Sequence, residues 1–350
     1  MKSFLELNSK KKEDRLKQAE AFYGAIVDVH HHILPQAYLE ALADSGVHQS
    51  IGVLFPDWTI EKDLKTMDRL GIKRAILSFS SPGANVPGIE NARNLARFCN
   101  DFMAQTIKAQ PGRYGAFATL PPLEDLSGAL KELEYAMDEL ALDGVALSSN
   151  YDLKYLGDAS FEPVHKALNA RNAVVHVHPT DPPGVQFGIP AAVMDAPFDA
   201  TRAAVSLICS GVMERYPDIT FILSHGGGVL PYLSYRIGKM VPHIWKSFTQ
   251  NAPKGFDKYL NQFYYDSAIV GPDAFPCLIK HAGASRVIFG TDYPFAGRAV
   301  PAECLEAIQN FTQISCQNRY EILEKNASAL FPRLCKIKPP LAHPLQDRST

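Results

Sequence analysis

Eight short apolar runs alternate along this chain with longer segments of helical periodicity, and this alternation constrains the fold more than any other feature. The runs are rich in β-branched and aromatic residues, as buried strands are. They span residues 25–30, 74–79, 114–120, 144–147, 173–178, 220–224, 263–267 and 286–290. Helical patterns lie between them, at 61–70, 89–110, 126–142, 163–171 and 200–215. Eight strands, each followed by a helix, is the count of a closed (β/α)8 barrel, so we predict an α/β protein built as a single TIM barrel.

The length of 350 residues suits one such barrel, because (β/α)8 domains commonly reach this size. The sequence contains no internal repeat or flexible linker that would divide it. We predict an N-terminal helical extension over 1–22, the barrel over 23–335 and a C-terminal tail over 336–350. Segments 43–58 and 180–195 are interpreted as loop insertions on the barrel.

Charge and cysteine usage narrow the class of protein. A formal net charge of -2 gives no basic surface for nucleic acid or an anionic membrane. The sequence has no apolar run long enough to span a bilayer, and its N-terminus is charged and lacks an apolar signal core. The six cysteines are scattered without a CxxC pair, which favours free thiols in a reducing compartment. We therefore expect a cytoplasmic protein.

A histidine-rich motif ends the first predicted strand, where Asp28 and Val29 precede three consecutive histidines. Strand alternation places His30 and His32 on one face and His31 on the other. Two imidazoles on the same face can bind a single divalent metal ion, whereas His31 is interpreted as structural. The motif predicts half of a metal site.

Other polar residues end later predicted strands. His178 ends the fifth strand, His225 follows the sixth and precedes three glycines, and Asp292 follows the eighth. In a closed barrel the carboxyl ends of the strands converge on one mouth, where such enzymes carry out their chemistry. We therefore expect these three residues to lie close to His30 and His32. The glycine run is not a phosphate-binding loop, because the GxxxxGK[ST] pattern is absent.

Three further residues have two readings each. His176 shares the parity of His178, so it is either a competing ligand or a residue packed one layer deeper. Asp266, which ends the seventh strand, either orients a ligand imidazole or forms a loop hydrogen bond. Arg236, eleven residues after His225, either reaches a substrate carboxylate or another subunit, or lies on a solvated helix surface.

In combination, the motifs resemble those of the amidohydrolase superfamily. They are His30-x-His32, His178-Pro179, Ser224-His225 with its glycine run, and Gly290-Thr291-Asp292-Tyr293-Pro294. The branch they resemble contains the metal-dependent, non-oxidative decarboxylases related to aminocarboxymuconate semialdehyde decarboxylase and 6-methylsalicylate decarboxylase. The resemblance covers about residues 25–335. It implies a carboxy-lyase with His30, His32, His178 and Asp292 as metal ligands and His225 as a catalytic base or water-orienting residue.

The sequence departs from two patterns of this branch. The first ligand pair is His-x-His rather than the Glu-x-His of the γ-resorcylate type. Residues 45–58 contain no arginine that would bind a second carboxylate. An aromatic monocarboxylate is therefore the expected substrate, and aromatic side chains are expected to wall its ring. These candidates are Phe55, Trp58, Phe187, Tyr232, Tyr293 and Phe295.

The expected reaction is decarboxylation of an ortho-hydroxybenzoate such as 6-methylsalicylate, which would release carbon dioxide and a phenol. The proton donor is either Asp292 or His225, with Arg236 as a possible substrate contact. Zinc is the expected metal and manganese the alternative. The resemblance implies a homodimer or a higher homo-oligomer. Two other functions stay open: metal-dependent hydrolysis of a lactone or amide, and a barrel that keeps its metal only for stability or binding.

Overall fold

The computed structural model describes residues 25–182, 188–297 and 299–337. Eight parallel strands form one sheet in the order β1-β4-β5-β6-β9-β10-β11-β12. Their bounds are β1 Ile26–His32, β4 Ile72–Ser78, β5 Tyr114–Thr119, β6 Gly144–Ser148, β9 Val174–His178, β10 Thr220–Leu223, β11 Tyr264–Asp266 and β12 Val287–Ile288. The backbone N–H of Val29 donates to the carbonyl of Phe289 over 3.0 Å, and His31 bridges to Tyr293. These contacts join the first strand to the last, so the predicted TIM barrel is confirmed.

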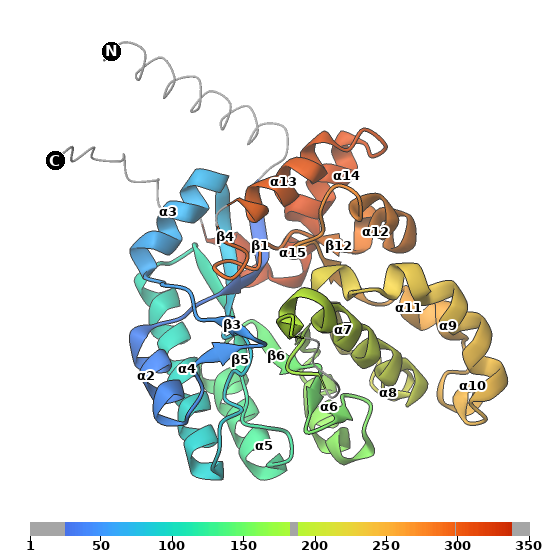
Figure 1. The fold of residues 1–350 in the computed structure, drawn as a ribbon, viewed down its shortest axis with the longest axis horizontal. Helices are drawn as coiled ribbons and strands as arrows, with labels where there is room; N and C mark the ends of the chain where they lie inside the picture. Colours follow the sequence, from blue (N-terminus) through green and yellow to red (C-terminus); the bar gives the residue numbers. More distant parts are fainter. Residues whose placement is uncertain (1–24, 183–187, 298, 338–350) are drawn as a thin grey trace.

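Helices surround the strands (Figure 1). The longer ones are α2 Gln36–Asp44, α3 Ile60–Leu70, α4 Ile89–Ala109, α5 Leu126–Glu134, α6 Glu162–Asn169, α7 Ala191–Cys209, α9 Leu230–Ile244, α12 Phe275–Ala282 and α13 Val300–Asn310. Shorter ones are α8 Val212–Arg215, α10 Phe248–Asn251, α11 Phe256–Leu260, α14 Cys316–Tyr320, α15 Asn326–Leu330 and α16 Pro332–Lys336. Two antiparallel hairpins, β2 Gln49–Ser50 with β3 Val53–Leu54 and β7 Asn150–Tyr151 with β8 Lys154–Tyr155, lie in the connections.

The strands bury apolar side chains on both of their faces, and the core therefore consists of two apolar clusters. The larger apolar cluster lies between strands and helices, as expected for a parallel sheet covered by helices. The smaller cluster joins strand residues such as Val27, Val29 and Phe117 to Phe331, which lies between α15 and α16, and to Leu334 of α16. Phe117 meets Phe331 edge to face at 5.6 Å. The last helices therefore pack against the inward-facing apolar side chains of the strands.

An irregularity in β1 sets which of its residues share a face. The pairing register with β4 shifts between Asp28 and His31, as at a β-bulge. Asp28 and His31 consequently bond to each other, with His31 Nδ1 2.8 Å from Asp28 Oδ2. The side chains of His30 and His32 lie together on the opposite face of the strand, with their Nε2 atoms 3.0 Å apart.

Two predicted segments differ from the structure. Residues 180–195 were expected to form a loop insertion, but α7 begins at Ala191, nine residues before the predicted helix. Its start follows Pro190, whose fixed φ suits the entry to a helix. The other expected insertion, 43–58, contains the hairpin of β2 and β3. The predicted extension 1–22 and residues 338–350 of the predicted tail lie outside the described residues.

Within the described ranges, no helix combines the length and apolarity needed to cross a bilayer.

Candidate metal centre and active site

Four side chains from three parts of the barrel converge at the carboxyl ends of the strands. His30 and His32 come from β1, His178 from the end of β9, and Asp292 from the loop after β12. One ligand atom from each lies within 4.8 Å of the others. The Oδ1 atom of Asp292 is 3.3 Å from His30 Nε2 and 3.1 Å from His32 Nε2. The structure therefore brings together all four residues that the sequence predicted as metal ligands.

Hydrogen bonds at the far side of two imidazoles fix their tautomers. His30 Nδ1 lies 2.8 Å from Asp266 Oδ2, and His178 Nδ1 lies 2.8 Å from the carbonyl oxygen of Pro179. Because these oxygens are acceptors, each Nδ1 carries the hydrogen. His32 Nδ1 pairs with the hydroxyl of Ser78 at 2.9 Å. The Nε2 atoms are left to face the centre.

The donor set fits a divalent cation. The buried Nε2 of His178 has no hydrogen-bond partner within the described structure. Buried polar atoms are normally paired, so a buried imidazole nitrogen without a hydrogen-bond partner, beside a carboxylate, fits the role of a metal ligand. Three imidazoles and one carboxylate, with their outer nitrogens held by oxygens, are a common ligand set for zinc and related ions.

Burial and neighbouring groups set the protonation of these ligands. Burial and the adjacent imidazoles lower the pKa of His178 well below its usual value, and burial lowers the pKa of His32 to about 4. Burial acts to raise the pKa of Asp292, but its contacts with His225, His30 and His32 outweigh this and hold it well below the usual range. His32 and His178 are therefore neutral and Asp292 is ionised, the states that bind a metal. Burial acts to lower the pKa of His30, but Asp266 and Asp292 outweigh it and raise that pKa to about 10, so metal binding must displace a proton from His30.

Asp266 links the first ligand to the catalytic candidate. Its Oδ2 contacts His30 Nδ1 at 2.8 Å and His176 Nε2 at 2.9 Å. Its Oδ1 accepts the backbone N–H groups of His225 and Ala268, at 2.9 and 3.0 Å. The possible orienting contact between Asp266 and a ligand imidazole is thus present. His176 stacks on Phe117 at 5.3 Å and bonds Asp266, so it lies outside the group of four.

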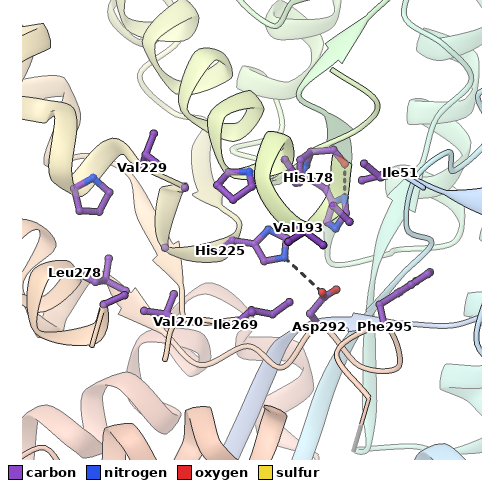
Figure 2. A pocket seen from close by; sticks show the side chains of 18 of the residues that line it. Ile51, His178, Val193, His225, Val229, Ile269, Val270, Leu278, Asp292 and Phe295 are labelled. Carbon is purple, nitrogen blue, oxygen red and sulfur yellow. Dashed lines mark hydrogen bonds and ion pairs between the residues drawn. The ribbon is translucent and has the colours of Figure 1, made fainter. Parts of the chain in front are cut away.

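His225 and Asp292 both adopt positive backbone φ angles, 53° and 58°. Non-glycine residues occupy this region at a cost, and such residues cluster at functional sites. The N–H of Asp292 donates to the carbonyl of His30 over 2.9 Å. His225 Nε2 lies 3.6 Å from Asp292 Oδ2, and the two side chains face each other across the pocket (Figure 2).

A cavity of about 720 Å³ opens beside this centre. His178, His225, Asp292 and Phe295 line its inner end, and Phe295 meets the His32 ring edge-on at 5.7 Å. Most other lining side chains are apolar. They include Ile51, Val53, Val193, Ala196, Val229, Ile269, Val270, Ala274 and Leu278. No lysine or arginine of the described ranges lines the cavity.

Several residues expected to contact the substrate lie elsewhere. Phe55 packs against the main apolar core, and the indole N–H of Trp58 donates to Asp63 Oδ2 over 2.9 Å. Tyr293 is stacked on His31. Arg236 is exposed on α9 and is absent from the cavity lining. Tyr232 does line the cavity, and Phe187 lies outside the described residues.

Sequence reasoning missed the lining that α7 and α12 provide. Val193 lies in the part of α7 that was expected to be a loop, and Ala196 lies between that loop and the predicted helix 200–215. Leu278 lies on α12, the helix after the seventh barrel strand, for which the sequence analysis gave no bounds. Ser78, the partner of His32, was also missed, although its place at the end of the second barrel strand was a usable signal.

Comparison with known proteins defines the class. The sequence profile of the amidohydrolase family matches residues 27–333, so this chain belongs to that family. A solved structure of an amidohydrolase II aligns with a TM-score of 0.81 and 26% identity, covering 88% of this chain and 100% of the other. The predicted family and fold are confirmed.

Several relatives within the family are decarboxylases. A 6-methylsalicylic acid decarboxylase of Penicillium expansum is 36% identical over 320 residues, which cover 89% of this chain and 97% of the relative. A dihydroxybenzoic acid decarboxylase of Polaromonas, solved with manganese and an inhibitor, aligns with a TM-score of 0.73 at 24% identity, covering 88% of this chain and 97% of that one. These comparisons confirm that the chain falls in the decarboxylase branch and that it is a carboxy-lyase.

Proposed function

We propose that this protein is a divalent-metal-dependent, non-oxidative decarboxylase of an aromatic ortho-hydroxy carboxylic acid, releasing carbon dioxide and a phenol. The observation that carries the proposal is the convergence of His30, His32, His178 and Asp292 beside His225, at the inner end of an apolar cavity. The relative from Penicillium expansum supports a salicylate-like substrate. The absence of lysine and arginine from the described lining favours a monocarboxylate, because a second carboxylate would be buried unpaired.

His30, His32, His178 and Asp292 would hold the ion. When bound, it would supply positive charge that attracts the anionic carboxylate and the phenol oxygen of the substrate. Phe295 borders the same end of the cavity and offers a flat apolar face to the ring. Fixing the ring against the proton donor removes part of the entropic barrier to reaction.

Proton delivery is assigned to His225. Asp292 is ionised, because its contacts with three imidazoles hold its pKa well below the usual range, so it has no proton to give. His225 Nε2 faces the cavity 3.6 Å from Asp292 Oδ2. A proton transferred from His225 to the carboxyl-bearing carbon interrupts the aromatic ring. The carbon–carbon bond to the carboxylate then breaks, its electron pair restores the ring, and carbon dioxide leaves.

The metal is proposed to be zinc or manganese. Three imidazoles and one carboxylate suit zinc, whereas the solved Polaromonas decarboxylase contains manganese. The test is to strip the protein with a chelator, reload it with each ion and incubate it with a panel of ortho-hydroxybenzoates. We expect carbon dioxide and the matching phenol in equal amounts, only after reloading. Opening of a lactone without carbon dioxide release would indicate a hydrolase instead.

We also propose a cytoplasmic homo-oligomer. All six cysteines are free, as suits a reducing compartment. Large apolar side chains of α9 are exposed, among them Tyr232 at 83%, Tyr235 at 76% and Ile244 at 69%. Such a surface is typical of an interaction site. Sedimentation of the purified protein should give at least the mass of a dimer, and a monomer at micromolar concentration would contradict this.

A further inference from the structure

We propose that the active site takes an ortho-hydroxybenzoate that carries an extended alkyl chain, and that the chain binds in an apolar arm of the cavity beyond His225. The inference rests on the proposed function and adds the substrate class. We define the distal arm as the part of the cavity lined by Val229, Val270, Ala274, Cys277 and Leu278.

The distal arm lies away from the reacting centre. In Figure 2, His178, Asp292 and Phe295 lie on one side of His225, whereas Val229, Val270 and Leu278 lie on the other. The two ends belong to one cavity. A substrate whose carboxylate meets the metal ligands at the first end can therefore extend past His225 into the second.

The walls of the distal arm are apolar and fixed in place. Val270 and Leu278 are only 7% and 2% exposed. They pack around the glycine run after His225, since a Cβ on Gly226 would lie 3.0 Å from Val270 and 3.5 Å from Leu278. Ala274, the N-cap residue of α12, and Cys277 in its first turn are exposed at the rim. No charged side chain of the described ranges lines the arm.

The size and chemistry of the cavity both favour a chain rather than a small or polar substituent. About 720 Å³ is in the range of pockets that bury drug-sized ligands, and a single methylated ring would leave the arm filled with water. Water against aliphatic walls is unfavourable, so filling the arm with methylenes contributes binding free energy. Each buried methylene should lower KM roughly fourfold. A charged or hydroxylated substituent would find no partner there.

The test is a series of 6-alkylsalicylates with methyl, propyl, pentyl and heptyl chains, assayed with the full-length, metal-loaded protein. For the wild type we expect KM to fall about fourfold per methylene until the arm is full, with kcat changing little. Ala274→Trp should fill the arm from an exposed position at the start of α12, so the variant should fold normally. In this variant, KM should no longer fall with chain length relative to its own value for the methyl compound.

The matched control is Ala37→Trp, an exposed alanine of α2 that does not line the cavity, and it should behave as wild type across the series. A KM that stays flat or rises with chain length in the wild type would overturn the inference. An equal loss for every substrate in Ala274→Trp would overturn the location of the arm. Failure of all members to release carbon dioxide would instead reject the proposed function, so the two failures are distinguishable.

Discussion

The two faces of β1 use the same side chain for different purposes. On the inner face, the Nε2 atoms of His30 and His32 lie 3.0 Å apart beside Asp292, in a set of donors that could hold a metal ion. On the outer face, both nitrogens of His31 are occupied by carboxylates, with Nδ1 2.8 Å from Asp28 and Nε2 3.0 Å from Asp63. Neighbouring oxygens, rather than residue type, decide whether a buried histidine is available as a ligand or is part of the scaffold.

The outer network also supports the inner site. Asp63, in the first turn of α3, accepts hydrogen bonds from Trp58 at 2.9 Å and Tyr114 at 2.7 Å. Asp28 accepts both the hydroxyl and the backbone N–H of Thr291, next to Asp292, at 2.6 and 3.1 Å. Burial acts against a charged His31, but the two carboxylates outweigh it and raise its pKa to about 10. A buried imidazolium thus joins α3, β1 and the loop that carries Asp292.

Among substitutions that test the difference between the two faces of β1, we expect the largest effect from His31→Phe, on the free energy of unfolding. Removing the imidazolium leaves Asp28 and Asp63 buried without their cation, and breaking a buried pair in this way typically costs about 3–5 kcal/mol. Urea unfolding of the metal-free protein should show this loss in the free energy of unfolding. His32→Ala is the control and should abolish metal binding with a smaller loss of stability. If the free energy of unfolding of His31→Phe were within about 1 kcal/mol of wild type, as for an exposed ion pair, the structural role of the outer face would be contradicted.

Next in size is His225→Ala, which tests the inner face without touching a proposed ligand. Loss of the proton donor should lower kcat by at least ~10²-fold, the scale typical of general acids. Metal content, measured by elemental analysis, should stay at that of the wild type, because His225 is outside the group of four. A variant that retains its metal and most of its activity would show that the proton comes from elsewhere.

The smallest of these effects is expected from Asp266→Asn. The amide has the size of the carboxylate but is uncharged and has only one accepting oxygen. It therefore accepts hydrogen bonds from His30 Nδ1 and His176 Nε2 less well than the carboxylate does. Loss of such an orienting partner typically weakens metal affinity about 10–100-fold, which competition with a chelator would measure. Asp143→Asn, at a carboxylate that pairs with Arg333 far from the centre, is the matched control and should leave the affinity unchanged. Equal metal affinities in the two variants would contradict a role of Asp266 in orienting the ligand His30.

Much of the architecture was predictable because strand patterns are local and the strands of a (β/α)8 barrel lie side by side in chain order. The sequence placed strands at 114–120 and 144–147, and the structure has them at Tyr114–Thr119 and Gly144–Ser148. The common location of His30, His178 and Asp292 followed from the convergence of strand ends in a barrel. The apolar lining from Val193 and Leu278 did not follow, because it depends on how helices far apart in sequence pack over the mouth.

Side-chain partners were harder to predict than positions. Trp58 is a residue type that often contacts aromatic ligands, yet its indole N–H donates to Asp63, which lies on the next helix. The contact of His31 with Asp63 depends on how α3 packs against β1. Nothing within the His30–His32 motif indicates this packing. The register shift between Asp28 and His31 is likewise a property of the strand pairing with β4.

Diffraction from crystals of the metal-loaded protein, recorded at the absorption edge of the bound ion, tests the central claim most directly. The account predicts one anomalous peak in the middle of His30 Nε2, His32 Nε2, His178 Nε2 and an oxygen of Asp292, at distances of about 2.0–2.2 Å from each. A peak that omits His178 or Asp292, or one lying instead among His30, His176 and Asp266, would contradict it.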